Sequence, residues 1–121
     1  MQDFRKLKVW HRAHALVLDV YSGTVRFPTD ERYGLTAQLR RASASIPTNI
    51  AEGCGRGSDQ DFARFLQIAM GSASEVEYLL LLAVDLKFLD AAAHSSLHSG
   101  AEEVKRMLSA LLAKLRAEAN G

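Results

Sequence analysis

Apolar residues recur every three or four positions along almost the whole chain, and this spacing is typical of amphipathic helices. No segment shows the sustained two-residue alternation that marks a half-buried strand. Turn-forming and capping residues divide the pattern into four segments. We therefore expect an all-α protein whose helices cover about residues 5–26, 30–52, 58–87 and 91–117.

The boundaries between these segments follow from local stereochemistry. Pro28 closes the first helix, because proline disfavours helical geometry in the residue before it. Gly53 and Gly55 are expected to end the second helix, since glycine readily adopts the left-handed conformation of a helix C-terminus. The caps expected at the helix starts are Thr29 or Asp30 for the second helix, Ser58 for the third and Asp90 for the fourth.

Long helices joined by short corners predict an up-down-up-down antiparallel four-helix bundle, with residues 1–121 forming a single domain. One apolar stripe of each helix should face the core of this bundle. The predicted inward stripes are Leu7, Trp10, His14, Val17 and Tyr21 in the first helix, Leu35, Leu39, Ala42, Ile46 and Asn49 in the second, Phe62, Leu66, Ala69, Ala73, Val76, Leu80 and Ala83 in the third, and Leu97, Val104, Leu108, Leu111 and Leu115 in the fourth.

The third helix carries more apolar surface than one buried face requires. Every position from Leu79 to Val84 is apolar, and at about 100° per residue this run goes right around the helix. The helix is either wedged deep in its own bundle or buries a second stripe against another subunit. We favour the second interpretation, because a long exposed leucine patch is an aggregation liability. The predicted homo-oligomer interface comprises Phe65, Ile68, Leu79, Leu82 and Leu86.

The composition is that of an ordinary soluble protein. Hydrophobic residues make up 48% of the chain, charged residues make up 24%, and the formal net charge is +1. The single cysteine, Cys54, excludes an internal disulfide and fits a reducing compartment. The N-terminus lacks the apolar core of a signal peptide, and the longest apolar run is far shorter than the roughly 20 residues of a membrane span. We therefore expect a cytoplasmic protein with no membrane segment.

Metal binding and nucleophilic catalysis both find weak support in the sequence. Bundles build metal sites from Glu-x-x-His pairs, and no glutamate here precedes a histidine by three residues. The pairs His11/His14 and His94/His98 begin helices at opposite ends of the expected bundle, so they should not converge. Cys54 lies at a helix C-terminus, where partial negative charge disfavours the thiolate. The sequence therefore predicts no metal, no cofactor and no catalytic residue.

The segment from Gly53 to Ser58, GCGRGS, is the one stretch that suggests a phosphate-binding loop. It matches neither common phosphate-binding motif, and no strand precedes it. Asp59 and Asp61 already place two carboxylates in the first turn of the following helix, where they would repel a phosphate. We interpret the segment as a corner between two helices.

Polar residues interrupt the facing stripes of the second and third helices. Pro47 removes a backbone donor inside the second helix and should bend it. A buried polar network that links the two helices would fix their register, and we prefer this structural role to a catalytic one. The residues of the predicted network are Ser45, Asn49, Glu52, Ser72 and Glu75.

Basic residues gather in or beside the second helix and the corner that follows it. They are Arg32, Arg40, Arg41, Arg56 and Arg64. Such residues are usually solvated and paired with nearby carboxylates. A row of arginines can, however, also bind the phosphate backbone of a nucleic acid. No aromatic residues are interleaved with them, so base stacking is not indicated. These five arginines form the predicted nucleic-acid surface.

Three stretches together resemble one known family. They are FRKLKVW, FPTDERYGLTAQLRRASASIPTNIAEG and FARFLQIAMGSASEVEYLL, which span about residues 4–90 in the family's order. The chain resembles the bacterial four-helix-bundle proteins first named for genes within intervening sequences of 23S ribosomal RNA. The last helix matches the family only in general character.

The resemblance implies an all-helical bundle that assembles into a ring, typically a homopentamer, with no established enzymatic activity. It also implies a relationship to accessory proteins of diversity-generating retroelements, which bind nucleic acid and a reverse transcriptase. The near-neutral chain departs from those basic relatives. Two hypotheses follow: an oligomer that binds structured RNA or other nucleic acid through its arginines, and a protein scaffold or adaptor with no nucleic-acid role.

Overall fold

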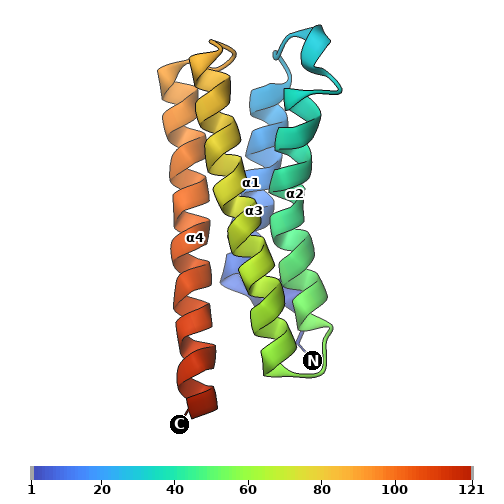
Figure 1. The fold of residues 1–121 in the computed structure, drawn as a ribbon, viewed down its shortest axis with the longest axis vertical. Helices are drawn as coiled ribbons and strands as arrows, with labels where there is room; N and C mark the ends of the chain where they lie inside the picture. The colour runs from blue at the N-terminus through green and yellow to red at the C-terminus, as the bar shows by residue number, and fades with distance from the viewer. Residues whose placement is uncertain (1, 121) are drawn as a thin grey trace.

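The computed structural model describes residues 2–120 and places four long helices and no strand within that range (Figure 1). The helices are α1 (Lys8–Thr24), α2 (Leu35–Cys54), α3 (Asp59–Asp85) and α4 (Ala91–Asn120), and the short 3-10 helices η1 (Phe4–Lys6) and η2 (Thr29–Glu31) precede α1 and α2. The four long helices pack side by side, with α1 against α2 and α4 and with α3 against the same two helices. The all-α prediction is confirmed.

The second helix begins at Leu35, and the prediction of a start near residue 30 with a cap at Thr29 or Asp30 is wrong. The chain first makes the 3-10 turn η2, and Gly34 then takes backbone angles outside the helical region (φ −104°, ψ −115°). A carboxylate oxygen of Glu31 accepts a hydrogen bond from the Leu35 N–H at 2.9 Å. This contact satisfies a free donor of the first turn, which is the task of a cap.

The caps predicted for α3 and α4 are confirmed. Ser58 Oγ accepts from the Asp61 N–H at 3.1 Å, and Asp90 Oδ1 accepts from the Ala93 N–H at 2.7 Å. Between these helices, Lys87 adopts a left-handed conformation with φ of 67°, and the Phe88 N–H reaches back to the Ala83 carbonyl at 2.9 Å. The turn therefore ends α3 with the hydrogen-bond pattern that normally favours glycine.

Of the two glycines expected to terminate α2, Gly55 lies at the C-cap, whereas Gly53 has another role. The helix continues through Gly53 to Cys54, and Gly55 keeps ordinary right-handed angles (φ −78°). A Cβ added at Gly53 would lie 2.9 Å from Phe65 Cβ and 3.0 Å from Phe62 Cδ1. Gly53 is therefore required for the close approach of α2 and α3, and not for a left-handed C-terminus.

The inward stripes predicted for α2 and α3 are buried, except that Asn49 is half-buried. In α4, Leu97, Val104 and Leu108 are buried, while Leu111 and Leu115 are half-buried. The stripe predicted for α1 is wrong. The residues of α1 that face the core are Val9, Ala13, Leu16, Val20 and Thr24, whereas His14 and Tyr21 are exposed. Two apolar stripes lie next to each other on α1, and packing against α2 and α4 selects between them.

By length and composition alone, α3 could cross a membrane, since an 18-residue window reaches a mean hydropathy of 1.2. The core helix of a soluble protein passes the same test. The apolar residues of α3 have a place in the core, because the residues from Phe62 to Ala83 that form its inward stripe are all buried within the chain.

Candidate functional site

A polar link joins the middle of α2 to the middle of α3. The hydroxyl oxygens of Ser45 and Ser72 lie 2.8 Å apart, and the Asn49 amide donates to the Ser45 carbonyl at 2.8 Å and to its hydroxyl at 3.0 Å. These three members of the predicted network do meet. Glu52 and Glu75 lie outside it: both are exposed, and Glu52 pairs with Arg56 in the turn that follows α2.

The arginines near the start of α2 have dissimilar surroundings. Arg40 folds back onto α1, where its Nε donates to Thr24 Oγ1 at 2.9 Å and its guanidinium lies 4.6 Å from the centre of the Tyr21 ring. Arg32 lies 5.5 Å from the centre of the Tyr33 ring. Arg41 is exposed and, within residues 2–120, forms none of the ion pairs of the structure.

The two arginines that follow α2 both make cation–π contacts with one aromatic ring. The guanidinium groups of Arg56 and Arg64 lie 4.8 Å and 4.6 Å from the centre of the Phe65 ring. Each also pairs with a carboxylate, Arg56 with Glu52 at 3.3 Å and Arg64 with Asp61 at 3.7 Å. Both side chains are therefore engaged within the chain at the corner between α2 and α3.

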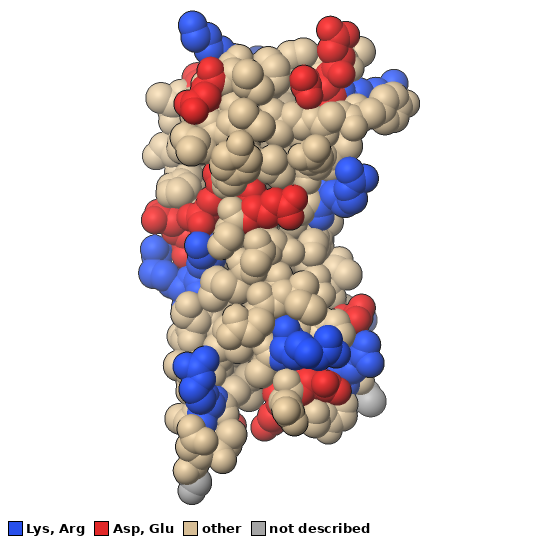
Figure 2. All heavy atoms as spheres, in the orientation of Figure 1, with Lys and Arg blue, Asp and Glu red and all other residues tan. Residues whose placement is uncertain are grey.

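The five predicted arginines do not form one patch. At a rise of about 1.5 Å per residue, Arg41 is separated by roughly 20 Å from Cys54, the last residue of α2, and Arg56 lies beyond that residue. Arg32, Arg40 and Arg41 lie just before α2 or in its first turns, whereas Arg56 lies in the corner after α2 and Arg64 in the first turns of α3. In Figure 1 the start of α2 and this corner are at opposite ends of the molecule. On the face drawn in Figure 2, basic and acidic side chains lie in small groups separated by uncharged surface. The structure thus divides the predicted nucleic-acid surface in two.

The second apolar stripe of α3 is also divided. Phe65 is 5% exposed and Leu79 is 4% exposed, so the prediction that these two residues form an oligomer interface is wrong. Phe65 packs against Gly53 of α2, and Leu79 belongs to the hydrophobic core of the chain. Ile68 and Leu86 are exposed and Leu82 is half-buried, and for these three the interface stays a prediction.

An apolar face runs along α1 beside α2. It contains a groove of about 310 Å³ whose aromatic side is formed by Phe4 and Trp10 and whose other side is formed by Ala44, Pro47 and Ala51 of α2. The indole of Trp10 stacks on the imidazole of His14, with ring centres 5.1 Å apart and planes 6° apart. Further along α1, Leu18 and Val25 are 55% and 71% exposed. The part of this face that the sequence pattern assigned to the core is half-buried at Trp10 and Val17 and exposed at His14 and Tyr21.

Cys54 is buried at the end of α2, and its carbonyl accepts a hydrogen bond from the Gln2 N–H at 3.0 Å. Burial raises the pKa of its thiol, and the nearby Asp3 carboxylate raises it further. Both effects disfavour the thiolate, which is the nucleophilic form. The cysteine is therefore a small core residue.

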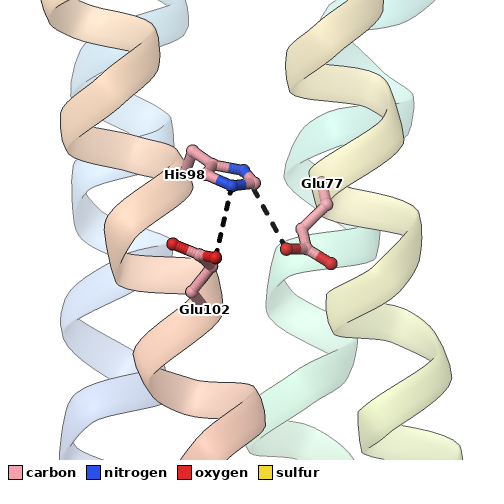
Figure 3. A group of neighbouring side chains, drawn as sticks. All are labelled: Glu77, His98 and Glu102. Carbon is pink, nitrogen blue, oxygen red and sulfur yellow. Dashed lines mark ion pairs between the residues drawn. The ribbon is translucent and has the colours of Figure 1, made fainter.

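One cluster of ionisable side chains lies between α3 and α4 (Figure 3). Nδ1 of His98 is 3.9 Å from Glu77 Oε2, and Nε2 of His98 is 3.7 Å from Glu102 Oε2. Lys105 donates to the other oxygen of Glu77 at 2.7 Å. The ring of His94 stacks on that of His98 one turn earlier in α4, with centres 5.6 Å apart.

The Glu-x-x-His pattern typical of metal sites in helical bundles does not reveal this cluster. Here the order is the opposite, because the histidine comes first: His98 precedes Glu102 by four residues, which is about one helical turn. Glu77 comes from a different helix, and its place beside His98 depends on the register between α3 and α4. The pattern His-x-x-x-Glu contains two residues of the cluster, His98 and Glu102.

By its fold, the chain is an all-α protein whose described residues form four packed long helices. The family of 23S rRNA-intervening sequence proteins matches residues 5–110, and the chain belongs to that family. The resemblance inferred from the sequence is thereby confirmed.

A solved structure has a similar fold, that of a protein of unknown function from the S23 ribosomal protein family of Bacteroides thetaiotaomicron. The two structures superpose with a TM-score of 0.78 and 23% sequence identity, over 86% of this chain and 97% of that one. At this identity the likeness establishes the fold alone. A comparison with curated proteins gives no match.

Proposed function

We propose that this protein is a non-enzymatic scaffold of the cytoplasm, in which up-down-up-down antiparallel bundles associate into a homo-oligomeric ring. The family resemblance favours a pentamer. The observation that carries the proposal is the open apolar face of α1 beside α2, with its groove between Trp10 and Pro47. A contiguous apolar face of this kind on a protein marks an interaction site.

A second apolar patch supports a ring in particular. Tyr78, Leu82 and Leu86 follow one another at one-turn intervals on α3, and Tyr78 and Leu86 are exposed. This patch belongs to a different helix from the α1 face, so contact between the two would join unlike surfaces of neighbouring subunits. Contacts between unlike surfaces close into rings when the rotation between subunits allows it.

Light scattering after size-exclusion chromatography tests the association. We expect a mass several times the 13.3 kDa of one chain, and His14→Glu and Leu86→Glu should each lower it, because they place a carboxylate in one of the two apolar patches. Ser22→Glu and Ser74→Glu are matched controls on exposed positions of α1 and α3, and they should keep the full mass. A wild-type monomer would contradict the proposal.

Binding of structured RNA is the second candidate function, and the exposed Arg41 favours it. Arg32 and Arg41 lie near each other in sequence at the start of α2, and neither forms an ion pair within the described residues. An electrophoretic shift of a ribosomal RNA fragment should weaken steeply between about 50 and 200 mM salt, because phosphate contacts release counterions.

The matched variants for this test are Arg41→Gln and Arg106→Gln, the second being an exposed arginine of α4. Only Arg41→Gln should reduce the shift. If no shift occurs at the lower salt, the protein-scaffold function stands alone. A partner that a pull-down recovers equally well after nuclease treatment would then support that function.

A further inference from the structure

We propose that Glu77, His98 and Glu102 form a binding site for a transition-metal dication, with Zn²⁺ as the ion that fits best. The three side chains converge from α3 and α4 in Figure 3, and one ligand atom from each lies within 4.8 Å of the other two. Two carboxylates and an imidazole are a set of ligands that zinc uses in proteins. The proposal does not depend on the association of subunits.

The three side chains are near enough to reach metal-binding distances by small movements. A zinc ion lies about 2.0–2.2 Å from nitrogen and oxygen ligands, so neighbouring ligand atoms in a tetrahedral site are roughly 3.3–3.6 Å apart. One ligand atom each from Glu77, His98 and Glu102 lies within 4.8 Å of the other two, so side-chain movements of about an ångström would bring the set to these distances. Glu77 lies nearest Nδ1 of His98 and Glu102 lies nearest Nε2, so a metal bound through one nitrogen requires the other carboxylate to rotate toward it. The imidazole selects zinc over magnesium and calcium, which prefer oxygen ligands.

A second observation points to a ligand at the same place. Nδ1 of His98 is inaccessible to solvent and has no hydrogen-bond partner among the described residues. Buried polar atoms are normally satisfied, and an exception calls for an explanation such as a bound ion. This nitrogen is the one that faces Glu77, so coordination of a metal between the two helices would satisfy it.

Lys105 sets the charge of the site. Its ammonium group donates to Glu77 Oε1 at 2.7 Å, which fixes the carboxylate and leaves Oε2 directed toward His98. With two carboxylates and one ammonium, the cluster has a net charge of −1 when His98 is neutral, so it attracts a dication. The ammonium also repels the metal, and its removal should therefore strengthen binding.

Zinc titration by calorimetry on the full chain, after dialysis against a chelator, tests the proposal. We expect one Zn²⁺ per chain and a rise in melting temperature on addition of zinc, because a ligand that binds the folded state stabilises it. His98→Gln and Glu102→Gln should each weaken binding at least tenfold. His14→Gln, which changes an exposed histidine of α1, is the matched control and should bind zinc as the wild type does.

Lys105→Met provides an independent test with the opposite sign, since it should bind zinc several-fold more tightly than the wild type. It keeps the proposal falsifiable if the other variants fold poorly. Equal zinc affinity in the wild type and in His98→Gln would overturn the proposal, as would the absence of any binding at 100-fold excess zinc. Weaker binding by Lys105→Met would also overturn it.

Discussion

The corner between α2 and α3 and the last turns of α4 lie at the same end of the molecule, yet they are packed very differently (Figure 1). At the corner, Gly53 brings the backbone of α2 so close to Phe62 and Phe65 that no Cβ fits between them. Along α4, a groove of about 420 Å³ separates Leu112 and Leu115 from the start of α3. A second groove of about 270 Å³ lies on its other side, against the start of α1.

The difference arises from the side chains that each helix offers to its neighbour. The corner combines one residue without a side chain and two phenylalanines, so large groups fill the space that the glycine leaves. Opposite the end of α4, the first turns of α3 present Gln60, Ala63 and Gln67. A small residue between two polar ones leaves the groove beside the leucines of α4 unfilled. Close packing therefore depends on matched sizes, and not on the number of apolar residues.

The largest expected loss of stability concerns Leu66 of α3, one turn beyond Phe62, and its counterpart is Leu112 near the end of α4. Leu66→Ala should lower the free energy of unfolding by about 3–5 kcal/mol, because Leu66 is fully buried and its loss leaves a cavity that well-packed neighbours cannot fill. Leu112→Ala should cost about 2 kcal/mol, since the grooves beside it let the site relax. Urea denaturation of both variants measures the difference. Equal losses would show that the end of α4 is packed as tightly as the corner.

A pair of glycines inside helices sharpens the comparison. Gly53→Ala should destabilise the protein by about 1–3 kcal/mol, because its Cβ would overlap Phe65. Gly71→Ala should stabilise it by about 0.5–1 kcal/mol, because a Cβ there meets nothing within 4 Å and alanine favours a helix. Thermal unfolding should show a lower melting temperature for Gly53→Ala and a higher one for Gly71→Ala than for the wild type. A stabilising Gly53→Ala would contradict the packing described for the corner.

The polar link between α2 and α3 should contribute less than the packing around it. Ser72→Ala removes the hydroxyl that lies 2.8 Å from that of Ser45, and it should cost about 1 kcal/mol. Ser74→Ala, on the exposed side of the same helix, should change stability by less than about 0.5 kcal/mol. A double-mutant cycle of Ser45→Ala and Ser72→Ala isolates the contact. Strict additivity would mean that the two hydroxyls do not stabilise each other.

The smallest effect concerns Cys54, whose pKa is raised in the folded state by burial and by Asp3. A raised pKa means that the folded state favours the neutral thiol. The resulting stability is fully present below the ordinary thiol pKa of about 8.5 and is lost as the pH rises through the folded value. The free energy of unfolding should therefore fall more steeply above pH 8.5 in the wild type than in Cys54→Ala. Parallel pH profiles for the two proteins would contradict this assignment.

The sequence by itself determined the helical fold and much of its local detail. The existence of four helices, the caps at Ser58 and Asp90, and the buried stripes of α2 and α3 all follow from residues within one segment. Helix periodicity and capping involve positions three or four apart, so a short window of sequence contains the whole signal. The family motif could also be recognised from the sequence alone, since it is a pattern along the chain.

Only the tertiary structure decided which groups meet across helices. It left the Trp10 stripe of α1 at the partly exposed edge of the core, used Gly53 for close approach, buried Phe65 and Leu79, and brought Glu77 to His98. Each outcome depends on the rotation and register of one helix against another. Those quantities are set by the fit of many side chains at once, and no single segment contains them.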